Sequence, residues 1–201
     1  MTGSADLLSV LDGPVLEAAP RLLGSVLRRD GVAVRITEVE AYDGADDPGS
    51  HAYRGSTPRS AVMFGPPGRL YVYFTYGMHH CANVVCGPDG RASAVLLRAG
   101  EVVEGVDTAR ERRGTKVDRE LARGPARLCS AMGIRLIDNR TDLVAGPTTL
   151  ELGGAVDDSA ISTGPRVGLR EAADRPWRFW ITGEPTVSAY RPAAARTRRH
   201  R

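Results

Sequence analysis

Two glutamates in the stretch ITEVEAY are the residues whose type and spacing most directly suggest chemistry. Glu38 and Glu40 lie two positions apart, so on a strand both side chains point to the same face. One carboxylate could act as a general base, or the pair could act as acid and nucleophile, as in glycosidases. Most such pairs form a solvated strand face, so spacing alone leaves these interpretations open.

Stacking and hydrogen-bonding side chains gather in the stretch LYVYFTYGMHHCAN, which holds three of the chain's six tyrosines. Tyr71 and Tyr73 share one face of a predicted strand, where they would form a stacking surface or an ordinary cross-strand pair. Tyr76 lies at or beside the turn that follows. The pattern is compatible with a polar, aromatic site but does not define one.

Metal binding is poorly supported by the histidines and cysteines. His79 and His80 are adjacent, so on a strand they face opposite ways and do not readily share a metal with Cys81. The three cysteines include no CxxC pair, so neither a zinc site nor a disulfide framework is predicted. His51 stands alone in a polar loop, where a surface role and a binding role both remain open. We expect no metal and no other cofactor.

The charge balance permits a polyanionic partner without requiring one. The chain has 27 Lys and Arg against 24 Asp and Glu, and its net charge is +3. Lys116 is the only lysine, so the other basic residues of this count are arginines, which suit phosphate but do not act as nucleophiles. Candidate phosphate ligands, which could equally be solvated charges, are Arg54, Arg59, Arg98, Arg123 and Arg127.

Length and composition predict one globular domain. The chain has 201 residues, of which 42% are hydrophobic and 25% charged. We assign residues 1–192 to this domain and residues 193–201, which are basic and lack apolar periodicity, to a disordered tail. No stretch has the apolar length of a membrane span or the features of an export signal, so a cytoplasmic protein is expected.

Strand patterns surround a long irregular segment. Residues 32–42 alternate in polarity, and residues 43–68 are rich in Gly, Pro and polar residues, as in loops kept for function. Three strands joined by tight turns are predicted at 69–75, 80–86 and 92–99. The core-facing residues of the first of these should be Leu70, Val72 and Phe74.

Helical patterns occupy the remaining long segments. A helix capped by Asp12 is predicted over 12–31, and others over 103–113 and over 118–134, the last interrupted at Gly124. Closing strands are predicted at 148–153 and 175–183. Together the elements indicate a mixed α/β (α+β) domain.

Several long motifs follow one another in a characteristic order. They are ITEVEAY, SHAYRGSTPRSAVMFGPPGRLYVYFTYGMHHCANVV, AVLLRAGEVVEG, RELARGPARLCSAMGI, GPRVGL and RPWRFWITG. Over about Leu22 to Ser188 this order resembles the alkyladenine (3-methyladenine) DNA glycosylase family. The resemblance implies a single domain with a curved antiparallel sheet, flanking helices and a protruding β-hairpin.

The resemblance also implies an activity and its catalytic residues. A monomer of this kind would bind damaged duplex DNA, flip out an alkylated or deaminated purine, and cut its N-glycosidic bond to leave an abasic site. Glu40 matches the general base that activates water, and Arg98 matches an arginine near that carboxylate and the flipped nucleotide's phosphate. Lys116 lies outside the matched motifs, so water rather than a lysine amine is the expected nucleophile.

Further residues match the family's base pocket. Tyr42, His51 and Tyr73 match the side chains that sandwich the flipped base, and Tyr71 is expected to support Tyr73. Asn83 matches the residue that would clash with the amino group of undamaged guanine.

A last set matches residues that contact the DNA itself. Tyr76 matches the wedge that enters the minor groove, with Met78 beside it in the turn. Thr57, Arg59 and Arg127 fall in motifs associated with the DNA backbone.

Two other functions stay open at this stage, together with the choice of lesion. One is a hydrolase of nucleosides or other small glycosides using Glu40, and the other is a non-enzymatic module that binds nucleic acid by stacking. The candidate lesions are 3-methyladenine, 7-methylguanine, hypoxanthine and ethenoadenine. Glu38 is expected to support the site from behind or to face solvent, rather than to act directly.

Overall fold

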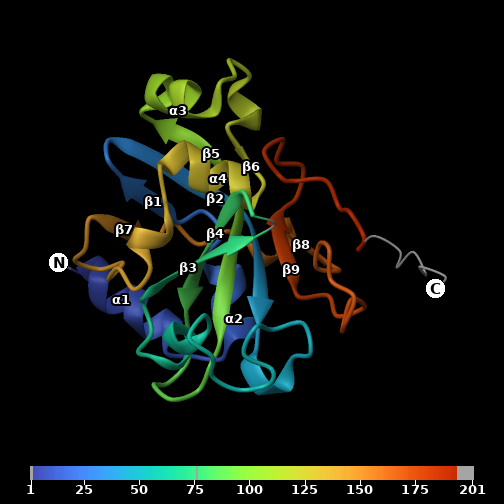
Figure 1. The fold of residues 1–201 in the computed structure, drawn as a ribbon. Coiled ribbons are helices and arrows are strands. Elements are labelled where there is room, and N and C mark those ends of the chain that lie inside the picture. The colour runs from blue at the N-terminus through green and yellow to red at the C-terminus, as the bar shows by residue number, and fades with distance from the viewer. Residues whose placement is uncertain (1, 76, 194–201) are drawn as a thin grey trace.

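One antiparallel sheet forms the centre of the molecule in the structure, a computed structural model that describes residues 2–75 and 77–193 (Figure 1). Its main path has the order β3-β4-β5-β2-β1-β7, while β6 pairs with β5, and β8 is joined through β9 to β2. The strands are β1 (Val26–Arg29), β2 (Val32–Tyr42), β3 (Leu70–Thr75), β4 (His79–Val85), β5 (Ala94–Glu104), β6 (Ala122–Arg123), β7 (Thr148–Glu151), β8 (Ile161–Gly164) and β9 (Arg178–Ile181).

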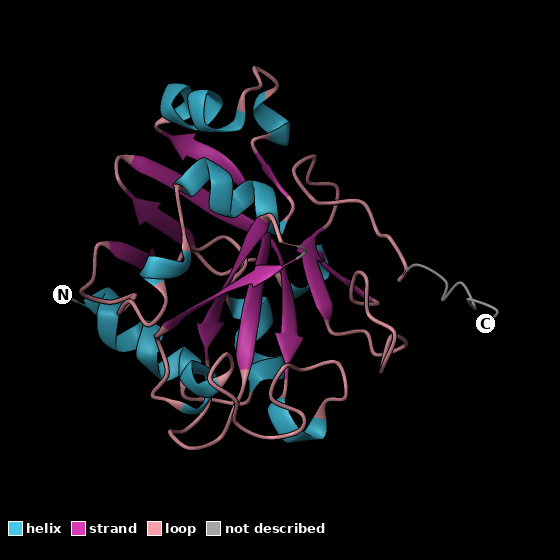
Figure 2. Ribbon diagram, in the orientation of Figure 1, coloured by secondary structure: helices cyan, strands magenta, loops and turns pink. Residues whose placement is uncertain are grey.

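Short helices accompany this sheet: α1 (Thr2–Leu11), α2 (Val15–Arg21), α3 (Val106–Arg113) and α4 (Pro125–Met132). Figure 2 shows the strands through the middle of the molecule, helices above and below them, and loops along the margins. The predicted mixed α/β class is therefore confirmed. Among the described residues, no helix is long and apolar enough to cross a membrane. The predicted tail falls almost entirely in 194–201, outside the described residues.

The organising strand is β2, whose bounds match the predicted strand over 32–42. Its first half pairs with β1 and its second half with β9, whereas β5 runs along the opposite edge. Glu38 and Glu40 point out of the sheet but are both 0% exposed, because arginines from β5 and β9 and two loops after β8 and β9 cover them. A solvated strand face is therefore the wrong interpretation of this glutamate pair.

The two faces of β3 contribute to different cores. Leu70 and Val72 belong to the main core, which also includes residues of α1, α2 and α4. Tyr71 lies in a second, smaller core beneath the long loop, and Tyr73 packs against that core. Phe74 does not face a core as predicted: it is 44% exposed near the end of the hairpin, where its ring lies 5.0 Å from that of His80.

The predicted helix over 12–31 is wrong in its second half. Pro14, not Asp12, precedes the helix, and α2 ends at Arg21, one residue after an internal proline. The left-handed Gly24 then donates its N–H to the carbonyl of Ile36, and Val26–Arg29 become β1. Pairing with two distant strands outweighs the local helical pattern there.

The other helical predictions are shortened in the same way. β5 extends to Glu104, so α3 starts only at Val106. Before α4, the chain forms a 3-10 turn over Asp118–Glu120 and the short β6, and the predicted break at Gly124 is confirmed by its φ of 120°. The sequence analysis missed α1 and β8.

Candidate active site

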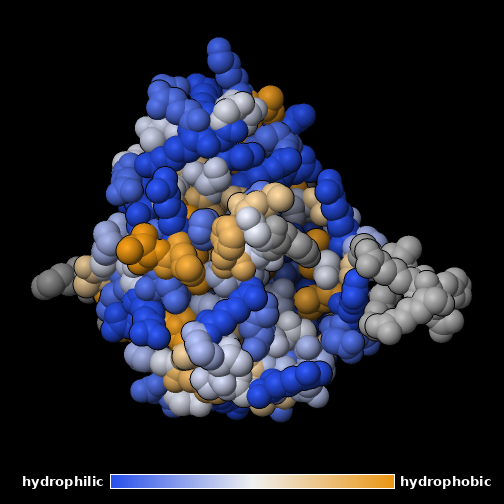
Figure 3. Space-filling model, viewed as in Figure 1, coloured by the Kyte–Doolittle hydropathy of each residue, from blue (hydrophilic) through white to orange (hydrophobic). Residues whose placement is uncertain are grey.

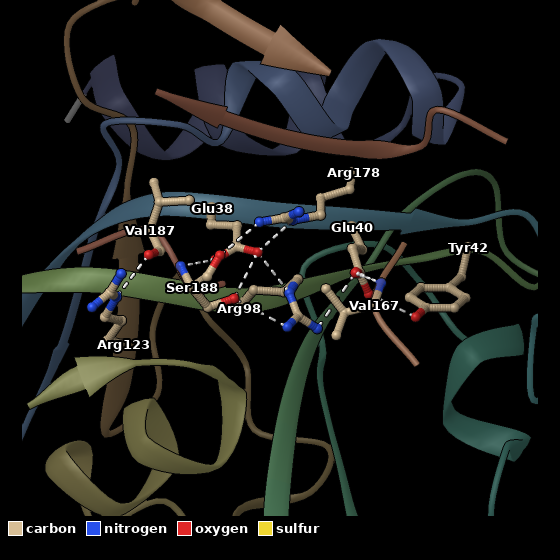
Figure 4. A network of polar contacts seen from close by, with 9 residues as sticks. All are labelled: Glu38, Glu40, Tyr42, Arg98, Arg123, Val167, Arg178, Val187 and Ser188. Atoms are coloured by element: carbon tan, nitrogen blue, oxygen red, sulfur yellow. Dashed lines mark hydrogen bonds and ion pairs between the residues drawn. The ribbon is translucent and has the colours of Figure 1, made fainter. Parts of the chain in front are cut away.

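The carboxylate of Glu40 is held by donors from three parts of the chain (Figure 4). The backbone N–H of Val167 donates to Oε1 at 2.6 Å, and the hydroxyl of Tyr42 donates to Oε2 at 2.8 Å. Arg98 Nη1 lies 3.4 Å from Oε1. All three partners are donors, so the arrangement suits a carboxylate that only accepts hydrogen bonds.

Tyr42 is suited to remain such a donor. Its burial, followed by the nearby Glu40 carboxylate, raises the pKa of Tyr42 well above its ordinary value. The phenol therefore keeps its proton at neutral pH and holds one oxygen of Glu40 in place.

Glu40 also lines a cavity of about 340 Å³. Every residue predicted for the base pocket borders this cavity, together with both predicted catalytic residues. Its lining comprises Glu40, Tyr42, Gly49, His51, Met63, Tyr71, Tyr73, Thr75, Cys81, Asn83, Leu96, Arg98, Pro125, Val167, Gly168 and Leu169. The fold thus brings residues from β2, β3, β4, β5 and two loops to one concave site.

An aromatic group forms one wall of the cavity. The His51 ring stands edge-on to that of Tyr73, with centroids 4.6 Å apart and an interplanar angle of 83°. His51 Nδ1 lies 3.1 Å from the hydroxyl of Tyr71, whose own ring centroid is 5.5 Å from that of Tyr73. Tyr71 is 1% exposed and packs behind the other two rings.

His51 has an unusual protonation behaviour for a loop histidine. Although the residue is exposed, its ring packs against the two tyrosines, and this burial, followed by the charge of Arg59, lowers the pKa of His51 to about 4. Its imidazole is therefore neutral at physiological pH and presents an uncharged ring to the cavity.

Asn83 lies on the adjacent strand, directly opposite Tyr71 in the β3–β4 register. Its amide Nδ2 donates to the backbone oxygen of Tyr71 at 3.1 Å, and the residue is only 3% exposed. The side chain therefore holds a fixed position on the cavity wall.

Arg98 links Glu40 to a second buried carboxylate. Its Nε donates to Glu38 Oε1 at 2.8 Å, and the residue is 6% exposed. Burial alone would lower the pKa of Arg98, but the charges of Glu40 and Glu38 outweigh it and raise that pKa above the ordinary value. Arg98 thus stays charged beside the cavity.

A buried ion pair that was not predicted from the sequence lies behind the loops that line the cavity. Arg166 donates from Nη1 to Asp47 Oδ2 at 2.5 Å and from Nη2 to Asp47 Oδ1 at 2.7 Å, and both side chains are 0% exposed. The Arg166 guanidinium also lies over the rings of Tyr42 and Trp177. Arg166 lies in the GPRVGL motif, but nothing local distinguishes it from a solvated arginine.

The pair ties together the two loops that complete the cavity. Asp47 precedes Gly49 and His51, and Arg166 precedes Val167, whose N–H reaches Glu40. Gly49 is required at this junction, because a Cβ there would lie 2.7 Å from Leu169 and 2.8 Å from Arg166.

The chain matches a known protein family. The family description Methylpurine-DNA glycosylase (MPG) matches residues 9–185 of the chain. The chain belongs to the methylpurine-DNA glycosylase family. It is therefore a DNA glycosylase, a hydrolase of N-glycosyl bonds that acts on alkylated purines in base excision repair.

Bacterial relatives provisionally named 3-methyladenine DNA glycosylase align over nearly the whole chain. One from Streptomyces avermitilis is 57% identical over 195 residues, which cover 92% of each chain. One from Nocardia farcinica is 54% identical over 202 residues, covering 94% of each chain. One from Cutibacterium acnes is 49% identical over 187 residues, covering 90% of this chain and 98% of the relative.

Among the residues predicted to contact the DNA groove and backbone, those that the structure describes lie outside the cavity of this glycosylase. Arg59 is exposed and lies 4.9 Å above the ring of Tyr73, and Met78, at the hairpin turn, is 67% exposed. Thr57 and Ser60 bond to each other within the loop, with their hydroxyl oxygens 2.9 Å apart. The proposed wedge, Tyr76, lies outside the described residues.

Arg127 borders two further hollows of the glycosylase and forms an ion pair with Glu120. One hollow, of about 290 Å³, adjoins the cavity through Arg98 and Val167, which line both. The other, of about 480 Å³, reaches the hairpin, and four arginines and two histidines line it. They are Arg112, Arg113, Arg127, Arg135, His79 and His80.

The hairpin histidines have no arrangement suited to a metal. His79 is exposed, His80 packs on Phe74, and Cys81 borders the cavity. Within the part of the chain that the structure describes, no group of three His, Cys, Asp or Glu residues is placed to hold a metal ion.

Proposed function

We propose that this glycosylase acts as a monomer on damaged duplex DNA, flips a modified purine into the cavity, and hydrolyses its glycosidic bond with a water activated by Glu40. The observation that carries the proposal is the position of the Glu40 carboxylate, which borders a cavity walled by Tyr42, His51 and Tyr73. An enzyme that hydrolyses the glycosidic bond of a stacked purine needs both a pocket for the extruded purine and a carboxylate next to the sugar of that nucleotide.

The chemistry requires one carboxylate and no covalent enzyme intermediate. A water between Glu40 and the anomeric carbon C1′ transfers a proton to Glu40 as its oxygen bonds to C1′. The bond between C1′ and the purine breaks, and its electron pair leaves with the base. Purines alkylated at N3 or N7 carry positive charge, so they leave readily and are attracted by tyrosine faces in the cavity.

The location of the single lysine supports water as the nucleophile. Lys116 borders a separate hollow beside α3, with Asp107 and Arg110, and does not border the cavity. A glycosylase that forms a Schiff base needs an amine at the sugar carbon. We therefore assign a monofunctional reaction that leaves an intact abasic site.

The two basic hollows, which share Arg127, support contacts with the DNA backbone next to the cavity and at the hairpin. The hollow at the hairpin has no carboxylate among its described lining residues, so its arginines favour phosphate. Arg98 borders the smaller hollow and the cavity, a position suited to the phosphate of the flipped nucleotide. Tyr76 would occupy the gap left in the stack, and Asn83 would reject the amino group of guanine.

Base release measured side by side tests the proposal. Matched duplexes carrying 3-methyladenine, 7-methylguanine, hypoxanthine or ethenoadenine are incubated with excess enzyme, with an undamaged duplex as the control. We expect release of the damaged bases, an uncut abasic strand, and no protein–DNA adduct after borohydride treatment. Tight binding without release, or a trapped adduct, would contradict the mechanism.

A further inference from the structure

Glu38 accepts four hydrogen bonds beside Glu40, yet it does not border the cavity. Its Oε1 accepts from Arg98 Nε at 2.8 Å, from Arg178 Nε at 2.7 Å and from the Ser188 hydroxyl at 2.9 Å. Its Oε2 accepts from the Ser188 backbone N–H at 2.7 Å. Figure 4 shows these contacts converging on Glu38 next to Glu40.

This network fixes the orientation of the Arg98 guanidinium. Nε is bonded to Glu38, and Nη2 is bonded to the Ser188 hydroxyl at 3.2 Å. A planar group fixed at two nitrogens has its third nitrogen placed as well. That third nitrogen, Nη1, faces Glu40.

The distance from Arg98 to Glu40 shows the effect of this restraint. Nη1 lies 3.4 Å from Glu40 Oε1, whereas charge-assisted contacts of this type are typically about 2.7–2.9 Å. Arg98 is therefore close enough to Glu40 to act on its charge, but is not in a short two-bond pair with it. A carboxylate held in such a pair would be a weaker base.

The charges in the network are balanced. Glu38 and Glu40 face Arg98 and Arg178, two negative groups against two positive ones. Burial would raise the pKa of Glu38, but Arg98, Arg178 and the Ser188 bonds outweigh it and lower that pKa below the ordinary value. Glu38 is therefore ionised throughout the working pH range, and neutralising it leaves one excess positive charge beside Glu40.

We propose that Glu38 is a positioning residue for the glycosylase reaction, which holds Arg98 together with Ser188 so that Glu40 stays free to act as the base. This inference rests on the role of Glu40 proposed above. Ser188 lies beyond residues 9–185, which the family description matches. Its segment is anchored by Arg178 Nη2, which donates to the Ser188 carbonyl, and by Arg123 Nε, which donates to the Val187 carbonyl, both at 2.8 Å.

Glu38→Gln is the principal test, because it removes the charge and keeps the shape. We expect single-turnover base release to slow by about ten- to a hundredfold, with unchanged affinity for the damaged duplex. The acidic limb of the pH–rate profile should move to lower pH by on the order of one unit, because the excess positive charge favours the ionised form of Glu40.

The pH readout concerns every titratable group that faces Glu40. These are Tyr42 on β2, Tyr73 on β3, Cys81 on β4 and Arg98 on β5. Burial raises the pKa of Tyr73 and of Cys81. The substitution at Glu38 replaces none of these four residues, but it removes from Arg98 one of the two carboxylate charges that raise the pKa of Arg98. The shift therefore reports the charge at position 38.

Arg178→Gln provides the opposing measurement. It leaves one excess negative charge in the network and should move the acidic limb of the pH–rate profile to higher pH. Ser188→Ala removes only the hydroxyl contacts, so it provides a mild variant if the buried substitutions unfold the protein. It should slow release less than Glu38→Gln, without a change in DNA affinity.

Two results would overturn the inference. One is a wild-type rate of base release in Glu38→Gln or Ser188→Ala. The other is slow base release in which the acidic limb of the pH–rate profile is unshifted and the melting temperature falls to a matching extent. Failure of the proposed function is distinguished by Glu40→Gln: if that variant still releases base, the role of Glu40 itself is wrong. If it is inactive while Glu38→Gln behaves as wild type, only the role of Glu38 is wrong.

Discussion

At the inner end of the cavity Glu40 and Arg98 are almost fully buried, whereas Arg59 and Met78 on the hairpin side are exposed. The inner residues lie on long central strands and have several bonded partners each. The outer residues lie on a loop and a turn, where Arg59 donates to the carbonyl of Phe74 and lies over the ring of Tyr73, and Met78 is 67% exposed. The difference separates two tasks: bond cleavage needs fixed geometry, whereas approach to DNA needs accessible charge and adaptable apolar surface.

The molecular surface has both the accessible charge and the apolar area that an approach to DNA needs. In Figure 3, hydrophobic colour crosses the middle of the visible face between hydrophilic areas above and below it. Exposed large hydrophobic side chains of the chain include Phe74, Met78, Leu136 and Ile137. Such a surface suits a partner with both charged and apolar groups, as a duplex with an opened base stack has.

The largest effect on activity is expected for Glu40→Gln, in the buried region. Loss of the general base should slow single-turnover base release by about 10²- to 10⁴-fold while duplex binding is kept, because the pocket walls are unchanged. Rapid-quench measurement of base release, with binding measured by fluorescence anisotropy, tests this. Glu151→Gln, in an exposed pair with Arg28, is the matched control. Equal losses of binding and rate would refute a purely chemical role.

The second prediction compares a buried pair with an exposed one. Asp47→Ala leaves Arg166 buried without its partner and should lower the free energy of unfolding by about 3–5 kcal/mol. Glu104→Ala, whose pair with Arg28 is exposed, should lower it by about 1 kcal/mol or less. Urea denaturation measures both, and similar losses would remove the distinction between the two regions.

A smaller effect is expected at the outer rim. Arg59→Ala should weaken DNA binding and reduce the log–log salt slope by about one, because one phosphate contact is lost. Binding measured at several salt concentrations tests this, with Arg110→Ala on α3 as the control, since Arg110 pairs with Asp107 and Asp118. An unchanged slope would exclude Arg59 from the phosphate contacts.

The smallest effect concerns His51 and pH. Its pKa of about 4 lies below the ordinary value of 6.5, so the unfolded chain takes up a proton first as the pH falls. The contribution to stability is thus complete above about pH 6.5 and declines towards pH 4. Urea denaturation across this range should show a shallower decline in His51→Gln, and an NMR midpoint for His51 near 6.5 would contradict the burial of its ring.

Much of the site could be predicted from local sequence, because its parts lie in continuous motifs. The alternation of 32–42 gave the bounds of β2, and the motif resemblance brought Glu40, Tyr73 and Asn83 to one cavity, where the structure has them. The resemblance carried most of this assignment, since spacing alone left Glu40 with three interpretations.

The remaining features depend on distant partners that leave no local pattern. The sequence left Glu38 either supporting the site from behind or facing solvent, because its bonds to Arg98 and Ser188 span 60 and 150 positions. The ion pair of Arg166 could not be predicted for the same reason, because its partner Asp47 lies 119 positions away in the sequence. The helix over 12–31 failed because β1 gains two strand partners that periodicity cannot reveal.

The bond between Glu38 and Ser188 also sets an order of events during synthesis. The two residues are 150 positions apart, and at translation rates of about 5–20 residues per second the second follows the first by roughly 8–30 s. Near the end of that interval the growing chain contains Glu38, Arg98 and all the lining residues of the cavity, but not yet Ser188, the second residue that bonds to Arg98. The contact that completes the restraint on Arg98 can therefore form only after the cavity residues have been synthesised.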